Sequence, residues 1–344
     1  MKALLMEEYK KLKFTDVPDP VIEDSHDILV RVKAVSICGS DVHGFDGSTG
    51  RRRPPIIMGH EAAGEIAAVG GAVKNFKVGD RITFDSTIYC GRCFYCQNGD
   101  VNLCDDRMVL GVSCEEYRRH GAFAEYVLVP DHICYRLPEG LSYEEAAMTE
   151  PVGVAAHAFR MTEMKLDETV AVVGSGLIGL TLIQILRTSI SGKILALDTD
   201  GVRRQKSLEA GADIALDPAD PELEKKIKEA AGGRGADRAF EAVGATAPIQ
   251  TALAVTRKGG SVTLIGNVSP KIELPLQSVV TRQIRLQGSC AIAGEYPIAL
   301  DLMARKRIDV KSLISKAAPL SEGQIWFDKL YNREDNLLKV ELIP

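Results

Sequence analysis

Cysteine, histidine and glutamate, three residue types that bind zinc, surround one glycine-rich stretch of the sequence. His60 and Glu61 follow Gly59, Cys38 lies 22 positions before His60, and Glu150 comes much later. A mixed set of thiolate, imidazole and carboxylate can hold Zn²⁺ tetrahedrally and leave one position for water, which is typical of a catalytic site. Taken alone, His60 would be a core histidine and Glu61 a surface glutamate. Features elsewhere in the chain favour the metal site.

A hydroxyl and an imidazole follow Cys38 closely, at Ser40 and His43. Together they could carry a proton from a buried metal-bound oxygen to solvent. In isolation, both would fit a turn with a capping side chain. Beside a zinc ligand, the proton relay is the better interpretation.

Four cysteines form a second cluster within 15 residues, at Cys90, Cys93, Cys96 and Cys104. This is the spacing of a closed Cys₄ zinc site. Such a site folds a lobe that has little core of its own, and it has no open position for chemistry. A nucleic-acid-binding zinc module is the alternative, but the stretch is acidic and has no basic flank.

Two weaker signals lie near these clusters. Arg51–Arg53 could bind a phosphate or carboxylate of the substrate, although such a run is more often a solvated loop. Glu150 precedes Pro151, which predicts a helix boundary where the glutamate leaves the α region and its side chain can be aimed. On its own, Glu150 would be a surface residue.

The composition limits the class of protein. The 344 residues suffice for roughly two domains, and 45% hydrophobic with 26% charged residues is typical of a soluble globular protein. A net charge of −5 argues against nucleic acid or an anionic membrane as a partner. The first residues do not resemble a signal peptide, so we expect a cytoplasmic protein. In that compartment, the eight cysteines favour thiols or metal ligands over disulfides.

A dinucleotide-binding pattern begins near residue 169. A buried strand at 170–173 precedes the G-x-G-x-x-G turn, and an apolar helix follows to about Leu186; the glycines of the turn are Gly174, Gly176 and Gly179. The next strand ends in Asp198, 19 residues after the last glycine. The turn can meet a pyrophosphate, and Asp198 can accept hydrogen bonds from ribose hydroxyls. Because Asp198 would repel a 2′-phosphate, the pattern predicts NAD rather than NADP. A membrane span at 169–186 is disfavoured by the glycines and polar residues.

The remaining patterns define two domains. Strands and helices alternate to about residue 288, which predicts an α/β, doubly wound sheet, and Gly244 and Gly266–Asn267 end two of its strands, where ligands of such sheets lie. Residues 1–37 alternate apolar and polar side chains, which indicates β-rich, barrel-like structure. The last strand, Lys339–Ile343, is expected to rejoin this first domain, with a cleft between the two.

Four features together resemble the zinc-dependent medium-chain dehydrogenase/reductase family over essentially the whole chain: the stretch from Cys38 to His43, the Gly59-His60-Glu61 motif, the four-cysteine cluster and the segment from Gly174 to Asp198. The resemblance implies a GroES-like catalytic domain at residues 1–152 and 288–344, with the structural zinc lobe, around a Rossmann domain at 153–287. Cys38 and His60 then match catalytic zinc ligands, and Ser40 with His43 matches the proton relay.

The Glu150-Pro151 pair resembles the polyol branch of this family, which includes sorbitol dehydrogenase; liver-type alcohol dehydrogenases have cysteine at this position. In the polyol branch, zinc is held by cysteine, histidine, one carboxylate and water, and the carboxylate matches either Glu61 or Glu150. Glu150 is therefore expected as a metal ligand or a catalytic group.

The resemblance also implies contacts with NAD, at Leu177, Ile178, Arg203, Ile265, Gly266, Asn267, Cys290, Ala291 and Ile292. Two departures make sorbitol itself an unexpected substrate. Gly44 stands where sorbitol dehydrogenase has a substrate-site tyrosine, and residues 289–297 form a longer and different segment.

The expected activity is zinc-assisted oxidation of a secondary alcohol of a polyol or related sugar, phosphorylated or not, with hydride transfer to NAD⁺. Two zinc ions per chain, one catalytic and one structural, and a homo-oligomer, tetramer or dimer, are expected. A threonine-type amino-alcohol dehydrogenase is the alternative enzyme. A zinc-stabilised NAD-binding sensor is the non-enzyme alternative, but it would need neither an open metal position nor a relay.

Overall fold

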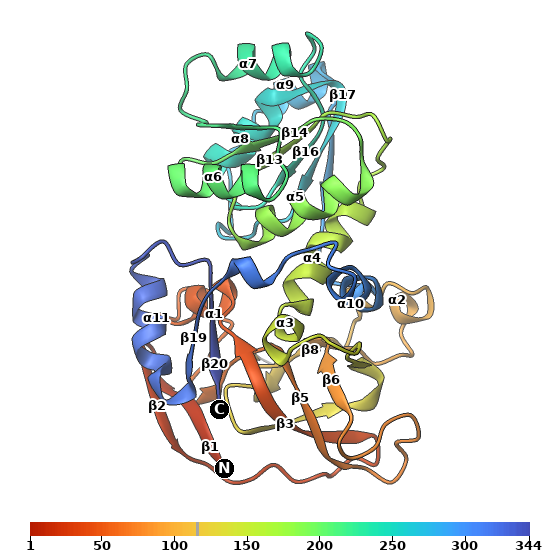
Figure 1. The fold of residues 1–344 in the computed structure, drawn as a ribbon, viewed down its shortest axis with the longest axis vertical. Coiled ribbons are helices and arrows are strands. Elements are labelled where there is room, and N and C mark those ends of the chain that lie inside the picture. The colour runs from red at the N-terminus through yellow and green to blue at the C-terminus, as the bar shows by residue number, and fades with distance from the viewer. Residues whose placement is uncertain (115–116) are drawn as a thin grey trace. The chain divides into compact units, whose positions relative to one another are not determined.

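The computed structural model describes residues 1–114 and 117–344, and the chain forms two compact units (Figure 1). The first unit contains Met1–Glu150 and Ile292–Pro344, and the second unit contains Pro151–Ala291. The junctions therefore lie at 150/151 and 291/292, where the sequence predicted 152/153 and 287/288. The first unit is made of two separate parts of the chain, and the second is continuous.

A seven-stranded sheet, in the order β12-β6-β5-β3-β20-β19 with β11 also paired to β3, forms the centre of the first unit. Its strands are β3 (Asp27–Ser36), β5 (Glu61–Val69), β6 (Arg81–Phe84), β11 (Tyr126–Pro130), β12 (Cys134–Arg136), β19 (Ile314–Pro319) and β20 (Lys339–Ile343). All neighbours are antiparallel except β19 and β20. The pairing of β20 with β3 confirms that the last strand rejoins the first domain.

Smaller sheets and short helices complete the first unit. The sheets are β2-β1-β4 (Lys11–Asp16, Lys2–Glu8, Ile56–Ile57), β7-β8 (Thr87–Ile88, Met108–Val109) and β10-β9 (Tyr117–Arg119, Val112–Cys114). The helices are α1 (Gly39–Gly44), α2 (Phe94–Gln97), α3 (Tyr143–Ala147), α10 (Tyr296–Ala304) and α11 (Gly323–Tyr331), with 3₁₀ turns η1 (Val101–Leu103), η2 (Asp131–Ile133), η3 (Lys311–Leu313) and η4 (Leu320–Glu322).

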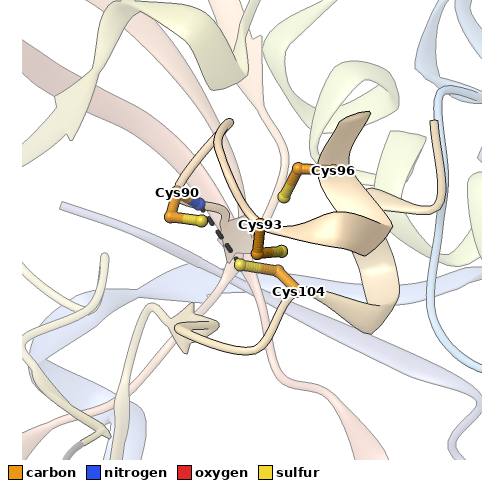
Figure 2. A group of neighbouring side chains, drawn as sticks. All are labelled: Cys90, Cys93, Cys96 and Cys104. Atoms are coloured by element: carbon orange, nitrogen blue, oxygen red, sulfur yellow. Dashed lines mark hydrogen bonds between the residues drawn. The ribbon is translucent and has the colours of Figure 1, made fainter. Parts of the chain in front are cut away.

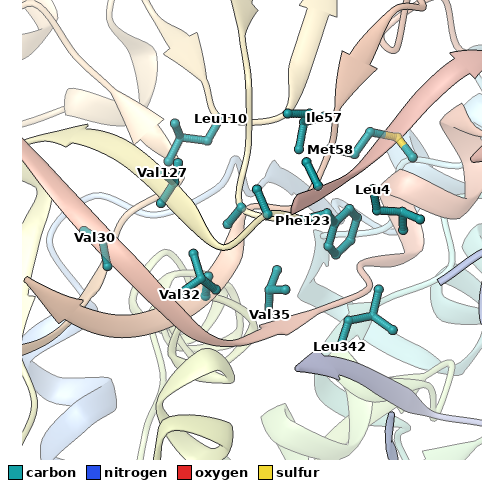
Figure 3. Packing of buried hydrophobic residues seen from close by; sticks show 14 of the residues in the cluster. Leu4, Val30, Val32, Val35, Ile57, Met58, Leu110, Phe123, Val127 and Leu342 are labelled. Atoms are coloured by element: carbon teal, nitrogen blue, oxygen red, sulfur yellow. The ribbon is translucent and has the colours of Figure 1, made fainter. Parts of the chain in front are cut away.

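Alternation along β3 builds the core of this unit. Val30 and Val32 are buried, whereas Arg31 between them is exposed, because successive side chains of a strand point to opposite faces. Figure 3 shows these valines in the same apolar cluster as Phe123 and Leu342, which come from distant parts of the chain. Burial of this cluster fixes the register of the strands that carry the candidate ligands.

The second unit is a six-stranded parallel sheet in the order β15-β14-β13-β16-β17-β18. The strands are β13 (Val170–Val173), β14 (Ile194–Leu197), β15 (Ile214–Leu216), β16 (Ala236–Glu241), β17 (Thr256–Leu264) and β18 (Arg285–Gly288). The helices are α5 (Leu177–Ser189), α6 (Gly201–Glu209), α7 (Leu223–Ala230), α8 (Thr246–Val255) and α9 (Leu276–Thr281). β13 and β14 are buried at every position, as expected of central parallel strands.

The predicted α/β class with a doubly wound sheet is confirmed. The uncharged run at 169–186 forms β13 and the first part of α5, and no helix among the described residues is long and apolar enough to cross a membrane. One local prediction was wrong, because Glu150 does not leave the α region. It is the second residue of α4 (Thr149–Arg160), so Pro151 lies in the first turn of the helix. Backbone N–H groups in the first turn have no intrahelical acceptor, so a proline there costs no hydrogen bond.

Candidate active site and metal centres

The register of β3 and β5 brings the predicted catalytic ligands together. Ser36, the last residue of β3, lies opposite Glu61, the first residue of β5. Cys38 lies just beyond the end of β3, and His60 directly precedes β5. The ligand atoms of Cys38, His60 and Glu61 consequently lie within 4.8 Å of one another. A thiolate, an imidazole and a carboxylate at this spacing fit Zn²⁺.

Asp41, which sequence reasoning missed, orients the imidazole of His60. Asp41 is fully buried on α1, and its Oδ1 lies 3.4 Å from Nδ1 of His60. Its Oδ2 accepts a hydrogen bond from the backbone N–H of Cys38 at 3.3 Å. A carboxylate at Nδ1 leaves Nε2 as the metal-binding atom. Asp41 and Cys38 form a capping box on α1, and the three-residue spacing was the sequence signal for it.

The charges at this site fit a bound cation. Burial lowers the pKa of His60, but the negative charges of Asp41 and Cys38 outweigh burial and raise that pKa well above its usual value. Among the described residues, the buried Nδ1 of His60 makes no hydrogen bond of good geometry, so its contact with Asp41 at 3.4 Å is electrostatic. A donor set with this excess of negative charge is matched by a divalent cation.

Glu61 forms a buried ion pair with Lys339, a second residue that the sequence did not indicate. Nζ of Lys339 lies 2.6 Å from Oε2 of Glu61, and the two side chains are 2% and 1% exposed. The same ammonium group donates to the carbonyl of Ile37 at 3.1 Å. Burial lowers the pKa of Lys339, but Glu61 and then Cys38 raise it more, so the lysine stays charged. β20 supplies this lysine, so the C-terminal strand completes the site.

Glu150 is partly buried at the start of α4 and is electrostatically linked to the cluster. Burial and then the negative charge of Glu61 raise the pKa of Glu150 to about 8, although His60 opposes the shift. Among the described residues, the compact ligand group contains Glu61 and not Glu150. The assignment of the ligating carboxylate to Glu61 or Glu150 therefore stays open.

The predicted relay residues lie on α1. Oγ of Ser40 lies 3.5 Å from Nε2 of His60, so its hydroxyl faces the atom that would bind a metal. His43 is an exposed residue, and burial of its ring followed by the charge of Arg333 lowers the pKa of the imidazole. Among the described residues, the Ser40 hydroxyl contacts Arg52 and His60 rather than His43. A relay between Ser40 and His43 would need a further group between them.

The preference for a solvated loop at Arg51–Arg53 was wrong for the middle arginine. Arg52 is only 4% exposed and forms an ion pair of 3.1 Å with Asp41, whereas Arg51 and Arg53 are exposed. Arg52 is therefore an internal part of the site. Binding of an anionic substrate by Arg51 and Arg53 stays a prediction.

The four-cysteine cluster is local. The sulfur atoms of Cys90, Cys93, Cys96 and Cys104 lie within 4.8 Å of one another. Figure 2 shows the four thiols gathered around one point, and the backbone N–H of Cys90 donates to the sulfur of Cys104 at 3.3 Å. Backbone N–H groups of Cys96 and Asp105 lower the pKa of the Cys93 thiol to about 7. Four convergent thiols, with one thiolate already favoured, fit a closed Zn²⁺ site.

The glycine turn of the second unit has the predicted geometry. Gly174 has φ of +93°, and a Cβ on Gly179 would lie 1.9 Å from the carbonyl oxygen of Gly174. Gly176 is the N-cap residue just before α5, and a Cβ there would meet nothing within 4 Å. The first and last glycines are thus required by the protein's own packing, whereas the middle one leaves room for a ligand such as a pyrophosphate.

Asp198 is held in place at the end of β14. Its Oδ2 accepts from the backbone N–H of Ser175 at 2.7 Å, and its Oδ1 accepts from the N–H of Asp200 at 2.9 Å. Each carboxylate oxygen keeps a further lone pair for a hydroxyl. Arg203, in the first turn of α6, is partly buried, while the neighbouring Arg204 is engaged by Asp217 at 3.0 Å.

The other predicted cofactor residues lie at strand ends. The turn Ile265–Asn267 follows β17, and a Cβ on Gly266 would lie 2.1 Å from the backbone nitrogen of Gly244, so these two turns pack backbone to backbone. Leu177 and Ile178 form the first turn of α5. Cys290 is exposed, Ala291 has φ of +51° and ends the second unit, and Ile292 is buried and begins the return to the first unit.

Comparisons with known proteins match both units of the chain. Residues 24–139 match the model of the alcohol dehydrogenase GroES-like domain, and residues 178–305 match that of the zinc-binding dehydrogenases. Sorbitol dehydrogenase of Bacillus subtilis is 34% identical, and the match covers 100% of this chain and 97% of that protein. D-arabitol-phosphate dehydrogenase of Enterococcus avium is also 34% identical, with coverage of 98% and 95%.

Solved structures extend the agreement to the whole fold. A Sinorhizobium meliloti protein, described as a zinc-binding dehydrogenase and bound to NADP, has a TM-score of 0.89 at 30% identity, with coverage of 100% of this chain and 99% of that chain. The expectation of an enzyme that uses zinc and a nicotinamide cofactor is thereby confirmed. The chain belongs to the zinc-dependent medium-chain dehydrogenase/reductase family, in the branch of the sorbitol dehydrogenase-like polyol dehydrogenases.

Proposed function

We propose that this enzyme oxidises a secondary alcohol of a polyol, sugar alcohol or related sugar, free or phosphorylated, to the ketone with NAD⁺. The observation that carries the proposal is the compact group of Cys38, His60 and Glu61, with Glu150 beside it. Relatives with similarity over nearly the whole chain are named sorbitol dehydrogenase and D-arabitol-phosphate dehydrogenase, which supports a polyhydroxylated substrate of either kind.

Residues of the first unit supply binding and proton transfer. Cys38, His60 and one carboxylate would hold zinc, which would supply Lewis-acid polarisation of the substrate oxygen. The Ser40 hydroxyl, 3.5 Å from Nε2 of His60, is placed to accept the alcohol proton. The lowered pKa of His43 keeps its imidazole neutral near pH 7, so it can take up a proton at the exposed end of the path.

The second unit would bind NAD, which would supply the acceptor for the hydride. The preference for NAD over NADP rests on Asp198, whose carboxylate is fixed by two backbone N–H groups and would repel a 2′-phosphate. Replacement of Asp198 by Ala is expected to weaken NAD binding and narrow the preference for NAD over NADP. The ratio of kcat/KM values for the two cofactors measures this, and an unchanged ratio would show that Asp198 does not bind the ribose.

We further propose two zinc ions per chain, one at Cys38 and His60 and one at the four cysteines. The residue types and separations of both groups support this stoichiometry. A dimer or tetramer is also proposed, and light scattering of the zinc-loaded protein tests it.

The experiment for the substrate is a screen for NADH production with zinc-loaded protein. C4 to C6 polyols, inositols, polyol phosphates and threonine are compared at equal concentration, and the His60→Ala variant serves as the matched control. Turnover of a polyol or its phosphate, lost in the variant, is the expected result. Turnover of threonine alone would identify the amino-alcohol alternative, and activity that survives in the variant would separate catalysis from this site.

A further inference from the structure

Arg52 reaches the metal-ligand group from a loop whose other arginines face solvent. Its guanidinium makes two contacts to Oδ1 of Asp41, at 3.3 Å from Nε and 3.1 Å from Nη2. Nη2 also donates to Oγ of Ser40 at 3.2 Å. One buried cation therefore holds both a carboxylate and a hydroxyl next to His60.

These contacts act on the Asp41 carboxylate and the Ser40 hydroxyl, which both lie next to the imidazole of His60. Oδ1 of Asp41, which receives both contacts from Arg52, is also the atom 3.4 Å from Nδ1 of His60. The position of this carboxylate determines the orientation of the imidazole, and the donated hydrogen bond determines where the Ser40 hydroxyl points. Because the Asp41 side chain is 0% exposed and that of Arg52 is 5% exposed, each needs the other's charge.

Gly44 provides the space for Arg52. A Cβ on Gly44 would lie 2.3 Å from Cγ and 3.2 Å from Cβ of Arg52. Gly44 does not have the positive φ found at Gly47 and Gly50, so its backbone conformation does not require glycine. The requirement comes from the arginine stem, which leaves no room for a side chain at the end of α1.

We infer that Arg52 is a positioning residue of the catalytic zinc site, and that Gly44 is needed because it admits Arg52. The guanidinium sets the orientation of His60 through Asp41 and holds the Ser40 hydroxyl toward the substrate oxygen. The inference rests on the proposed zinc ion at Cys38 and His60, whereas the identity of the substrate does not enter it.

The first test compares Arg52→Met, which keeps much of the stem and removes the charge, with Arg52→Lys. Zinc affinity is measured by competition with a chromophoric chelator, and the visible spectrum of the cobalt-substituted protein reports the ligand geometry. We expect Arg52→Met to weaken zinc binding about 10- to 100-fold, the range for lost outer contacts of metal ligands, and to change the spectrum. Arg52→Lys should recover part of both, and the exposed Arg51→Met variant should match the parent in both.

In kinetic measurements on the zinc-saturated protein, Arg52→Met should lower kcat about 10- to 100-fold. The KM for NAD should stay unchanged, because NAD binds through the second unit. A folded Arg52→Met protein with parental zinc affinity, spectrum and kcat would overturn the inference.

A double-mutant cycle with Gly44→Ala protects the test against general loss of folding. Gly44→Ala should lower zinc affinity and kcat by displacing Arg52, and it should add no further loss in an Arg52→Ala background, which lacks the Cγ atom that the new methyl group would meet. Additive losses would show that Gly44 acts independently of Arg52 and would overturn that part of the inference. Zinc affinity and the cobalt spectrum need no substrate, so a wrong polyol assignment does not affect these two measurements. If the parent oxidises polyols and the Arg52 variants match it in zinc affinity, spectrum and kcat, only the role of Arg52 is refuted.

Discussion

The two metal-ligand groups of the first unit are assembled over very different distances in the chain. Cys90, Cys93, Cys96 and Cys104 come from one 15-residue lobe and depend on each other. Cys38 and His60 come from the ends of two strands, and the surrounding charges are balanced by Lys339, which is 278 residues from Glu61. The first group can fold its own lobe around a metal, whereas the second exists only after the whole sheet has formed.

This difference also separates their chemistry. Four thiolates can satisfy a tetrahedral metal completely, which leaves no position for a substrate. The group of Cys38, His60 and Glu61 offers three potential ligand atoms, and the Ser40 hydroxyl and the Glu150 carboxylate lie nearby. We therefore expect changes in the first group to reduce stability and changes in the second to reduce turnover.

The largest effect is expected from Cys38→Ser. Loss of the only thiolate in the catalytic group should lower kcat/KM by at least about 100-fold, because even an outer contact of a metal ligand is worth 10- to 100-fold. The melting temperature should change little, since the sheet and the cysteine lobe remain. Turnover and thermal unfolding are measured on the same zinc-loaded preparation. Parental turnover in this variant would place catalysis elsewhere.

Cys96→Ser should have the opposite effect. It opens the Cys₄ site, whose metal affinity is part of the folding free energy. We expect the melting temperature to fall by roughly 5 °C or more, since each ~1 kcal/mol shifts it by about 2–4 °C in a domain of this size. The surviving folded fraction should keep most of its turnover per bound catalytic zinc. Full stability with abolished turnover would reverse the roles of the two groups.

Glu150→Cys makes the catalytic group more similar to the structural one. A third strong anionic ligand should retain or tighten zinc binding and make the metal a weaker Lewis acid. We expect polyol turnover to fall about 10-fold with little change in NADH affinity. Zinc content, NADH binding and turnover are compared with the parent. If all three are unchanged, Glu150 lies outside the working environment of the metal.

Asp85, in the chain between the two groups, should give the smallest effect. Burial raises the pKa of its carboxyl from 3.8 to about 7, and Glu295 adds to the shift. The folded state thus holds this proton more tightly than the unfolded state. The contribution of Asp85 to the free energy of unfolding is therefore fully present below pH 3.8 and is lost as the pH rises through about 7. Asp85→Asn lacks this dependence. Its melting temperature relative to the parent should therefore be higher at pH 8 than at pH 5, and a constant difference would contradict the assigned pKa.

The features that could be predicted from the sequence are those whose residues lie close together in the chain. The four cysteines and the glycines at Gly174, Gly176 and Gly179 lie close in the chain, so their types and intervals imply their geometry. The alternation of strands and helices likewise predicted the parallel sheet, and the apolar pattern at Lys339–Ile343 predicted the final strand.

The residues that balance charge at the catalytic group could not be predicted in this way. Lys339 resembled an ordinary strand residue, and its pairing with Glu61 depends on the register of β20 against β3. Arg52 resembled its exposed neighbours, and its burial depends on the space beside Gly44. Glu150 was misplaced because the proline rule does not distinguish the start of a helix from its end. For Lys339 and Arg52, the missing information was a tertiary contact.

The most direct test of two separate metal roles is a stepwise removal of zinc from the parent protein. A mild chelator is added while bound zinc, NADH production and thermal stability are followed in the same samples. We predict that turnover disappears when the first of two zinc equivalents is lost, that the melting temperature falls mainly with the second, and that added zinc restores turnover. Two results would contradict the account. One is full turnover after the first zinc equivalent is removed, with the melting temperature already lowered; the other is loss of turnover and of thermal stability in a single step.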